Sequence, residues 1–178
     1  LYTYTWGKGV NASQLQIYNA DCPKSVLAKP ESSFSGVDSV LKPRVSTNIT
    51  VSGSGYLQFD FGVEHAAWFE FSSTDLDVDL VQAGLIKASI SEYNEPWQGK
   101  TTAVVAYEGG NFRLETNPML YEGVRFAWIF FELPDQGYIN YTWHINSVRL
   151  VAQSRPVNYT GSFNTSNELL NRIWYTAA

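Results

Sequence analysis

The sequence is poor in charged residues and in the residue types that bind metals. Charged residues make up 16% of the chain, against about 25% in an ordinary domain, and 12 basic against 17 acidic side chains leave a net charge of −5. Because a phosphate backbone is recognised by a basic patch, we expect no nucleic-acid partner. The two histidines and the single cysteine lack the spacing of zinc ligands, so we expect no metal and no cofactor.

Several sequence signals are also missing. No apolar run approaches the roughly 20 residues of a membrane-spanning helix, so we expect no membrane partner. The G-x-S-x-G nucleophile motif is absent, although a Ser-His-Asp arrangement of distant residues stays open. Gly109-Gly110 lacks the strand–loop–helix context of a phosphate-binding loop. The first residues do not read as a signal peptide, so Leu1 of a secreted form would follow the cleavage point.

Aromatic residues, in contrast, are abundant. The 178 residues include six Trp, eleven Tyr and ten Phe, and 44% of the chain is hydrophobic. Disordered chains have few aromatics and a high net charge, so this composition excludes disorder. The length fits about one ordinary domain.

Sequons for N-glycosylation indicate secretion. Five Asn-x-Ser/Thr sequons occur, against roughly two expected from the composition, and the alternative is that some are unmodified polar loops. The lone Cys22 indicates either a disulfide partner elsewhere in the polypeptide or a small buried hydrophobic residue. We therefore expect an extracellular protein with glycans at Asn11, Asn48, Asn140, Asn158 and Asn164.

Most of the chain has the pattern of short β-strands. Alternating apolar and polar residues predict strands over 56–61 and 67–71, joined by a hairpin at 62–65. Gly109-Gly110-Asn111 predicts a tight turn. Residues 124–131 are apolar on nearly both faces, which predicts a central strand that is covered twice. Further strands are expected over 85–90, 101–107, 111–114 and 142–151.

The strand pattern predicts an all-β fold, an antiparallel jelly-roll-like β-sandwich over 1–160. Residues 1–50 are an irregular lead-in of loops and short strands, because prolines and serines interrupt them. Asp75, Asp77 and Asp79 alternate as the polar face or flank of a strand would.

The last segment breaks the β pattern. Thr165 and Glu168 have the spacing of a capping box, and an apolar stripe of helical period follows, formed by Leu169, Leu170, Ile173, Trp174 and Ala177. Such a stripe needs a partner, so we expect 161–178 to be a linker and the first helix of a following helical domain of the same polypeptide.

The acid–base and sugar-binding candidates lie in one loop, Ser91–Pro96. Glu92 and Glu95, beside Tyr93 and Trp97, could bind sugar hydroxyls, hold calcium or act as a glycosidase pair. The alternative for these carboxylates is a solvated loop or an inter-domain contact. Exposed rings suit the apolar face of a pyranose, but core packing is the other role open to Trp6, Trp97 and Trp143.

Three stretches resemble a known family. Tyr159-Thr-Gly-Ser-Phe-Asn-Thr-Ser-Asn-Glu-Leu-Leu-Asn-Arg-Ile-Trp-Tyr175 resembles the junction in α-L-rhamnosidases of glycoside hydrolase family 78, where a β-sandwich runs into the first helix of an (α/α)6 barrel. Tyr56-Leu-Gln-Phe-Asp-Phe-Gly62 is similar to the family's strand ending in Asp-Phe-Gly, and Glu122-Gly-Val-Arg-Phe126 to its Arg-aromatic strand. The resemblance covers about residues 55–178.

The resemblance implies a secreted enzyme that releases terminal α-L-rhamnose from a rhamnose-containing glycan or glycoside. The family inverts the anomeric centre with two carboxylates of the barrel, so the catalytic residues are expected beyond residue 178 and none within this chain. Residues 91–96 and 120–128 depart from the family's pattern, which leaves open a rhamnose–glucuronate lyase of the same architecture. The other alternative is a free-standing carbohydrate-binding module.

Overall fold

A computed structural model describes residues 16–20, 22–42, 47–96, 102–103, 106–114, 122–134, 142–154 and 162–177. Two short 3-10 helices, η1 (Glu31–Ser33) and η2 (Val37–Leu41), and two α-helices, α1 (Val78–Gln82) and α2 (Glu168–Ala177), accompany the strands. The strands are β1 (Gln16–Ala20), β2 (Ser25–Lys29), β3 (Phe34–Ser35), β4 (Ile49–Val51), β5 (Gly55–Ser72), β6 (Ile86–Ser91), β7 (Thr102–Ala103), β8 (Ala106–Glu108), β9 (Asn111–Arg113), β10 (Glu122–Phe131), β11 (Trp143–Ile145) and β12 (Ser147–Ser154).

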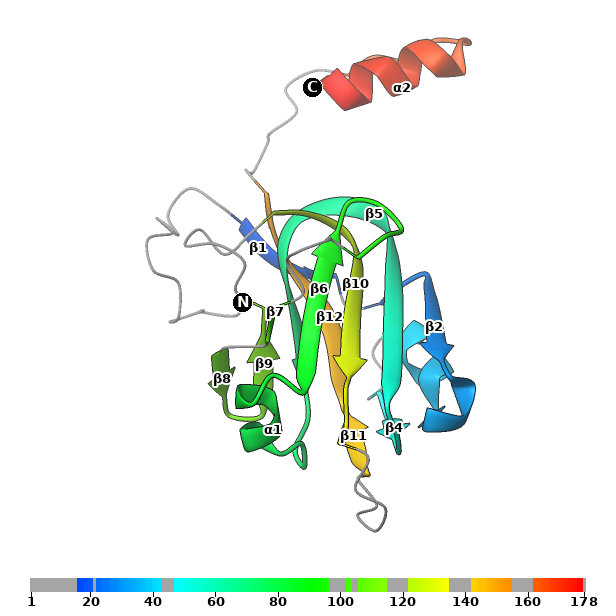
Figure 1. Ribbon diagram of the computed structural model, residues 1–178. Helices are drawn as coiled ribbons and strands as arrows, with labels where there is room; N and C mark the ends of the chain where they lie inside the picture. The colour runs from blue at the N-terminus through cyan, green and yellow to red at the C-terminus, as the bar shows by residue number, and fades with distance from the viewer. Residues whose placement is uncertain are drawn as a thin grey trace.

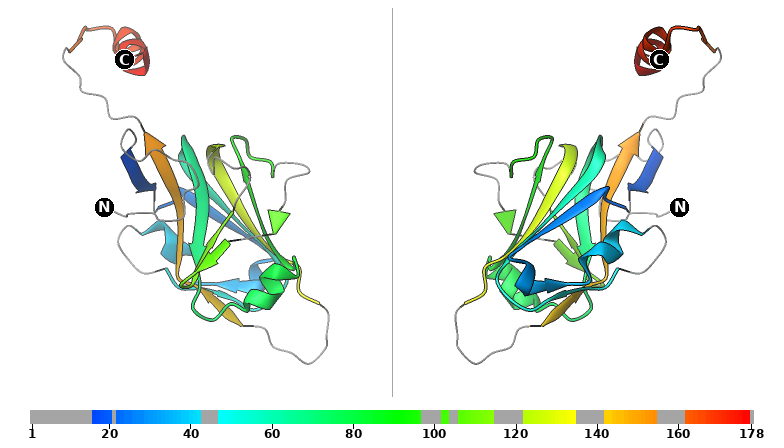
Figure 2. Two further views of the ribbon diagram at one scale, coloured as in Figure 1. Left: turned by 90° about the vertical axis from the view of Figure 1, so that its left-hand side faces the viewer. Right: turned by 90° about the vertical axis from the view of Figure 1, so that its right-hand side faces the viewer.

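The fold is mostly β, and the strand pairs within the described residues are antiparallel, as predicted. A large sheet has the order β1-β12-β5-β10-β6-β7, with β2 and β9 also paired to β5 and β8 paired to β9. A small sheet has the order β11-β4-β3. The large sheet folds over on itself, so that β12 lies on one side and β10 and β6 lie on the other (Figures 1 and 2).

Strand β5 is continuous, so the predicted hairpin at 62–65 is wrong. Residues 122–124 of β10 pair with 67–65 of β5, and residues 126–131 pair with 60–55. Successive residues of β10 thus pair with successively earlier residues of β5 along the whole strand. A hairpin at 62–65 would instead have reversed the direction of the chain relative to β10. Residues 61–64 form a bulge opposite Arg125, where Gly62 has a φ of 80° and donates its N–H to Asp60 Oδ1. The turn chemistry bends the strand without ending it.

Strand β10 is central, as predicted, because it pairs with both β5 and β6. Its alternate side chains enter the main core, where they meet apolar side chains of β5, β6 and β9. The opposite face of β10 carries Phe126 and Trp128, which are buried as well. Among the largest fully buried side chains of the core are Leu57, Phe59, Phe69, Phe71, Ile86, Phe112, Ile129 and Phe131.

The segment predicted as one strand over 142–151 is two strands in different sheets. β11 pairs with β4 in the small sheet, and β12 pairs with β5 in the large one. The break falls at Asn146, whose N–H donates to Ser72 and whose side-chain oxygen accepts from the Thr74 N–H. A side chain that competes for backbone hydrogen bonds redirects the chain here.

Two local signals had different outcomes. The Gly109-Gly110 turn is confirmed: both glycines have positive φ, and they join β8 to β9. The aspartates at 75, 77 and 79 do not lie on a strand face. Asp77 instead caps α1, because its Oδ1 accepts the N–H of Asp79 at 2.9 Å.

The described part of the lead-in consists of short strands and 3-10 turns, and it packs on the core. Ala28, Phe34, Val40 and Ile49 are buried there. No helix in the described part of the chain is long and apolar enough to cross a membrane.

Helix α2 forms where it was predicted, but its cap differs from the prediction. Asn167, rather than Thr165, caps it, because the Asn167 Oδ1 accepts the N–H groups of Leu169 and Leu170. The Thr165 hydroxyl accepts the Asn167 N–H, one residue outside the helix. In Figures 1 and 2 the helix stands apart from the sheets, and its apolar stripe is exposed, with Leu169, Leu170 and Ile173 accessible over 64%, 47% and 55% of their surfaces.

Candidate functional site

The candidate site lies where the β5 bulge, the start of β10 and the loop after β6 meet, close in the chain to the β5–β10–β6 face that carries Phe126 and Trp128. The register places Asp60 and Ser91 on either side of Phe126, and Gln58 and Ser89 on either side of Trp128. At the other end of this face Tyr56 lies 5.9 Å from Phe130, ring centroid to centroid. The face therefore combines aromatic side chains in its middle with polar side chains along both flanks.

The β5 bulge is fixed by an ion pair with its partner strand. Arg125 Nε lies 2.9 Å from Asp60 Oδ1, and Arg125 Nη2 lies 3.0 Å from Asp60 Oδ2, a bidentate pair. The Arg125 guanidinium, aided by the Gly62 N–H and opposed by burial, holds the pKa of Asp60 below its usual value. Asp60 in turn raises the pKa of Arg125. The Asp60 carboxylate and the Arg125 guanidinium thus form an ion pair with each other.

Two further carboxylates converge beside this pair, over Gly123 of β10. A Cβ atom on Gly123 would lie 2.6 Å from Glu64 Oε1 and 2.6 Å from Glu92 Oε1. The two oxygens consequently lie within twice that distance of each other. Both side chains are exposed, and within the described residues neither forms an ion pair or a hydrogen bond. The missing side chain of Gly123 leaves room for them.

The loop after β6 adds an aromatic ring and amides to the carboxylates. Tyr93 follows Glu92 and is 74% exposed, and its N–H donates to Ser91 Oγ at 3.0 Å. The Gln58 amide donates to Asn94 Oδ1, which joins β5 to this loop across β10. We call Glu64, Glu92, Tyr93 and Gly123 the acidic rim.

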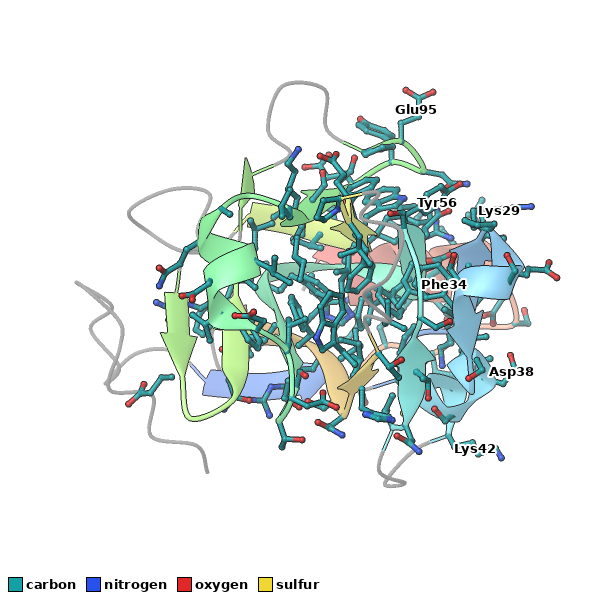
Figure 3. The ribbon with its side chains drawn as sticks, turned by 60° about the horizontal axis from the view of Figure 1, so that its bottom comes forward. Lys29, Phe34, Asp38, Lys42, Tyr56 and Glu95 are labelled. Atoms are coloured by element: carbon teal, nitrogen blue, oxygen red, sulfur yellow. The ribbon has the colours of Figure 1, made fainter. Side chains whose placement is uncertain are left out.

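The residues predicted for sugar contact have separate positions. Glu92 belongs to the acidic rim, where its neighbour is Glu64 from the bulge. Glu95 is exposed and points away from the sheet (Figure 3). In the same view Tyr56 of β5 and Lys29 of β2, which are paired across the two strands, lie side by side. Trp97 lies outside the described residues, as does Trp6. Trp143 is buried, so its role is core packing.

Two of the five sequons fall within the described residues, and the asparagine of each is exposed. Asn48 precedes β4, and its N–H donates to Ser39 Oγ at 3.1 Å. Asn164 precedes α2, and its Oδ1 accepts from Asn171. Asn11, Asn140 and Asn158 lie outside the described residues.

A serine, an aspartate and a histidine do meet, but not as a catalytic triad. Asp75 Oδ2 lies 2.6 Å from His144 Nδ1, and the Ser73 hydroxyl donates to the other oxygen of Asp75 at 3.1 Å. A nucleophile would have to contact the histidine, and here the carboxylate stands between them. Burial would raise the pKa of Asp75, but hydrogen bonds from His144 and Ser73 hold it below its usual value. The group ties the loop after β5 to β11.

A buried charged cluster lies on the outer face of the sheet around β12. Glu70 accepts the Trp68 Nε1–H at 3.1 Å and pairs with Arg149 at 2.9 Å. The Arg113 guanidinium lies over the Trp68 ring, 5.9 Å from its centroid. Glu70 and Arg113 are almost wholly buried, so this cluster has a structural role in joining β5, β9 and β12.

Sequence reasoning missed Glu64, Gly123 and the Asp60–Arg125 pair as members of the site. Glu64 was placed in a hairpin loop, and Gly123 was noted only as part of the stretch 122–126 that resembles a family strand, without a role of its own. One signal was available: Asp60 and Gly62 have the spacing of an Asx turn, in which an aspartate accepts a backbone N–H two residues ahead.

Within the described ranges, no three His, Cys, Asp or Glu side chains come close enough together to hold a metal ion. Comparison of the sequence with models of known protein families gives no match, and comparison with curated proteins gives no significant match.

Proposed function

We propose that the chain is the non-catalytic β part of a secreted, rhamnose-active glycosidase, and that the acidic rim contacts the glycan. The carrying observation is that the exposed Tyr93 directly follows Glu92, and that Glu92 and Glu64 converge over Gly123 without an ion pair among the described residues. The choice of rhamnose rests on the resemblance of the junction sequence to α-L-rhamnosidases.

The chemistry of the acidic rim suits a neutral sugar. An exposed tyrosine ring offers an apolar face with few rotatable bonds, which suits the C–H face of a pyranose. Carboxylates act only as acceptors and can each take hydrogen bonds from two sugar hydroxyls. Asn94 and Gln58 add donors and acceptors at the same edge. These groups can fix a sugar without reacting with it.

The carboxylate pair does not suit inverting hydrolysis. An inverting enzyme holds its two carboxyl groups about 6.5–9.5 Å apart so that a water fits between them, whereas the Glu64 and Glu92 oxygens lie closer together than this. Both are also exposed, while a general acid is normally shielded from water. We therefore assign the rim to binding and place the catalytic carboxylates in a following helical domain.

The proposal includes a jelly-roll-like sandwich and a helical barrel that begins with α2. The exposed stripe of Leu169, Leu170 and Ile173 supports the second part, because burial of such side chains is worth roughly 1.5–3 kcal/mol each. The alternative, a free-standing carbohydrate-binding module, would use the same rim but gives the stripe no role. A rhamnose–glucuronate lyase of the same architecture is the other alternative.

Secretion and glycosylation are part of the proposal as well. The exposed Asn48 and Asn164 support it, since a glycan needs access to water. Mass spectrometry of protein from a eukaryotic host, before and after enzymatic deglycosylation, tests both sites. Unmodified asparagine at every sequon would contradict a eukaryotic secretory origin.

The binding role is tested by substitution of Tyr93. We expect Y93A to weaken binding of a rhamnose-terminated oligosaccharide at least about tenfold in calorimetry. Stacking of a nucleic-acid base on one aromatic side chain is worth on the order of 1–3 kcal/mol, and we take the same order for the face of a pyranose. Y93F keeps the ring and should bind nearly as the natural protein does. The unfolding temperature should change little in both, because Tyr93 is exposed. Equal affinity of Y93A and the natural protein would contradict the proposal.

A further inference from the structure

We propose that Asp75 and His144 form a pH-sensitive clasp, which holds β11 of the small sheet against the loop after β5 and becomes stronger when the histidine gains a proton. Asp75 lies in the loop between β5 and α1, whereas His144 is the middle residue of β11. The two residues are 69 positions apart in the chain. Figure 1 shows α1 and β11 at the same, lower end of the sheets. The clasp therefore joins the small sheet to a segment that belongs to the large one.

The geometry of the clasp is that of one carboxylate bound twice by one residue. Asp75 Oδ1 accepts the backbone N–H of His144 at 2.9 Å, and Asp75 Oδ2 lies 2.6 Å from the ring atom Nδ1. The Ser73 hydroxyl donates to Oδ1 as well, at 3.1 Å. Burial raises the pKa of Asp75, but these hydrogen bonds outweigh it and hold the pKa below its usual value. The carboxylate is therefore ionised at every pH above about 5.

The surroundings of the ring leave Asp75 as its charged partner. Among the described residues, Asp75 is the one titratable side chain that forms a hydrogen bond or ion pair with His144. Across the sheet His144 pairs with the neutral Thr50, and neither β4 nor β3 contains a charged residue. The next carboxylates, Asp77 and Asp79, lie at the start of α1. A further negative charge there acts in the same direction as Asp75, because it favours a protonated ring.

Protonation changes the strength of this contact. A histidine ring ordinarily gains its second proton near pH 6.5. The neutral ring can donate a plain hydrogen bond from Nδ1, whereas the charged ring makes the same bond charge-assisted, which is roughly twice as strong. The His144 and Asp75 side chains are 40% and 38% exposed, so solvent limits the difference to a few-fold in the equilibrium between closed and open β11. The clasp should therefore be strong at pH 5.5 and weaken as the pH rises to 8.

Amide hydrogen exchange of residues 143–145 tests the inference, because the N–H of His144 is itself bound by Asp75. The readout is protection relative to unfolded peptides of the same sequence, so the chemical effects of pH and of a substitution cancel. H144Q keeps a side-chain N–H donor but cannot carry a charge. The matched control is H65Q, which makes the same change at the other histidine of the chain, in β5.

We expect H144Q to lower the protection of β11 about three- to fivefold at pH 5.5 and less than about twofold at pH 8.0. D75N, which removes the charged partner, should likewise abolish the pH dependence, and H65Q should retain it. An H144Q effect of equal size at both pH values would overturn the inference and leave the contact a purely structural one. Protection in D75N that still falls between pH 5.5 and pH 8.0 as in the natural protein would overturn it too.

Discussion

At the scale of single residues, two glycines with nearly the same backbone angle lie in very different surroundings. Gly36 has a φ of 69° and Gly84 a φ of 75°. A Cβ on Gly36 would lie 2.4 Å from the backbone oxygen of Asn48, whereas nothing lies within 4 Å of one on Gly84. The comparison separates the cost of the left-handed conformation from the cost of a clash.

We expect G84A to lower the free energy of unfolding by about 1 kcal/mol, the cost of a left-handed non-glycine residue. G36A should lose about 1–3 kcal/mol more, because a backbone atom cannot move aside as a side chain can. Urea unfolding of both variants checks this. Equal losses would mean that the segment around Asn48 yields without strain.

The Asp60–Arg125 pair predicts a pH-dependent stability. The folded pKa of Asp60 is lowered, so its contribution is present above the unfolded pKa of about 3.9 and is lost as the pH falls through the folded pKa. D60N keeps an oxygen for the Gly62 N–H but removes the charge. The gap in unfolding temperature between D60N and the natural protein should be largest near pH 6 and should close as the pH falls below about 4.

Asp38 provides the control for this series. It is exposed and forms no ion pair within the described ranges, so D38N should match the natural protein at every pH. A gap for D60N that does not change between pH 3 and pH 7 would show that its effect comes from packing and not from charge.

The residue types in the sequence could predict part of the site, but not which residues the fold brings together there. Glu92 and Tyr93 stood out because they are polar and aromatic neighbours in one loop. Glu64 is brought to Glu92 by the register of β5 on β10, and register depends on pairing over long sequence separations, which a local pattern does not contain. Trp143 could be a core residue or an exposed sugar-binding ring on sequence grounds. The burial that decides between the two depends on tertiary packing in the same way.

At the scale of elements, the alternating pattern correctly indicated which segments are β-strands, but it misplaced where those strands begin and end. The alternation in 56–61 and 67–71 correctly predicted two buried stretches, and both keep their inward residues. The residues between them looked like a turn because Gly62 is there. The bulge satisfies the same turn chemistry within one strand, so the sequence alone could not distinguish a bend from a reversal.

The cap of α2 gives a prediction at this scale. Asn167 accepts two helix N–H groups, and loss of such a cap costs roughly 1 kcal/mol. N167A should therefore raise the amide exchange rates of residues 169–172 severalfold. E168Q, which changes the residue expected to complete a capping box, should leave them nearly unchanged. Faster exchange in E168Q than in N167A would restore the capping-box assignment.

At the scale of the whole molecule, burial is uneven. Strand β10 is covered on both faces, and the lead-in and the sheets share one core. The all-β class could be read from the periodicity of stretches such as 56–61 and 67–71, in which apolar and polar residues alternate. The folding of the large sheet over itself could not, because it depends on β5 pairing with β10 in one half and β12 in the other.

Helix α2 carries the largest exposed apolar side chains grouped on one element among the described residues. Ile173 lies four residues after Leu169 and three residues after Leu170, so its side chain is a neighbour of both on one helix face. An apolar patch of this kind promotes association unless another surface covers it. We expect the 178-residue chain to sediment as a mixture whose mean mass rises with concentration, and L170K/I173K to sediment as a monomer at the same concentrations.

The control is V63K, which changes an exposed apolar residue, 63% accessible, in the β5 bulge and so outside α2. It should associate as the natural protein does, because a single scattered apolar residue is normal on a protein surface. The unfolding temperature of L170K/I173K should hardly change, since neither side chain is buried. A natural protein that stays monomeric, with residues 169–173 strongly protected from amide exchange, would show that the stripe packs on the sheets and that α2 belongs to the β domain.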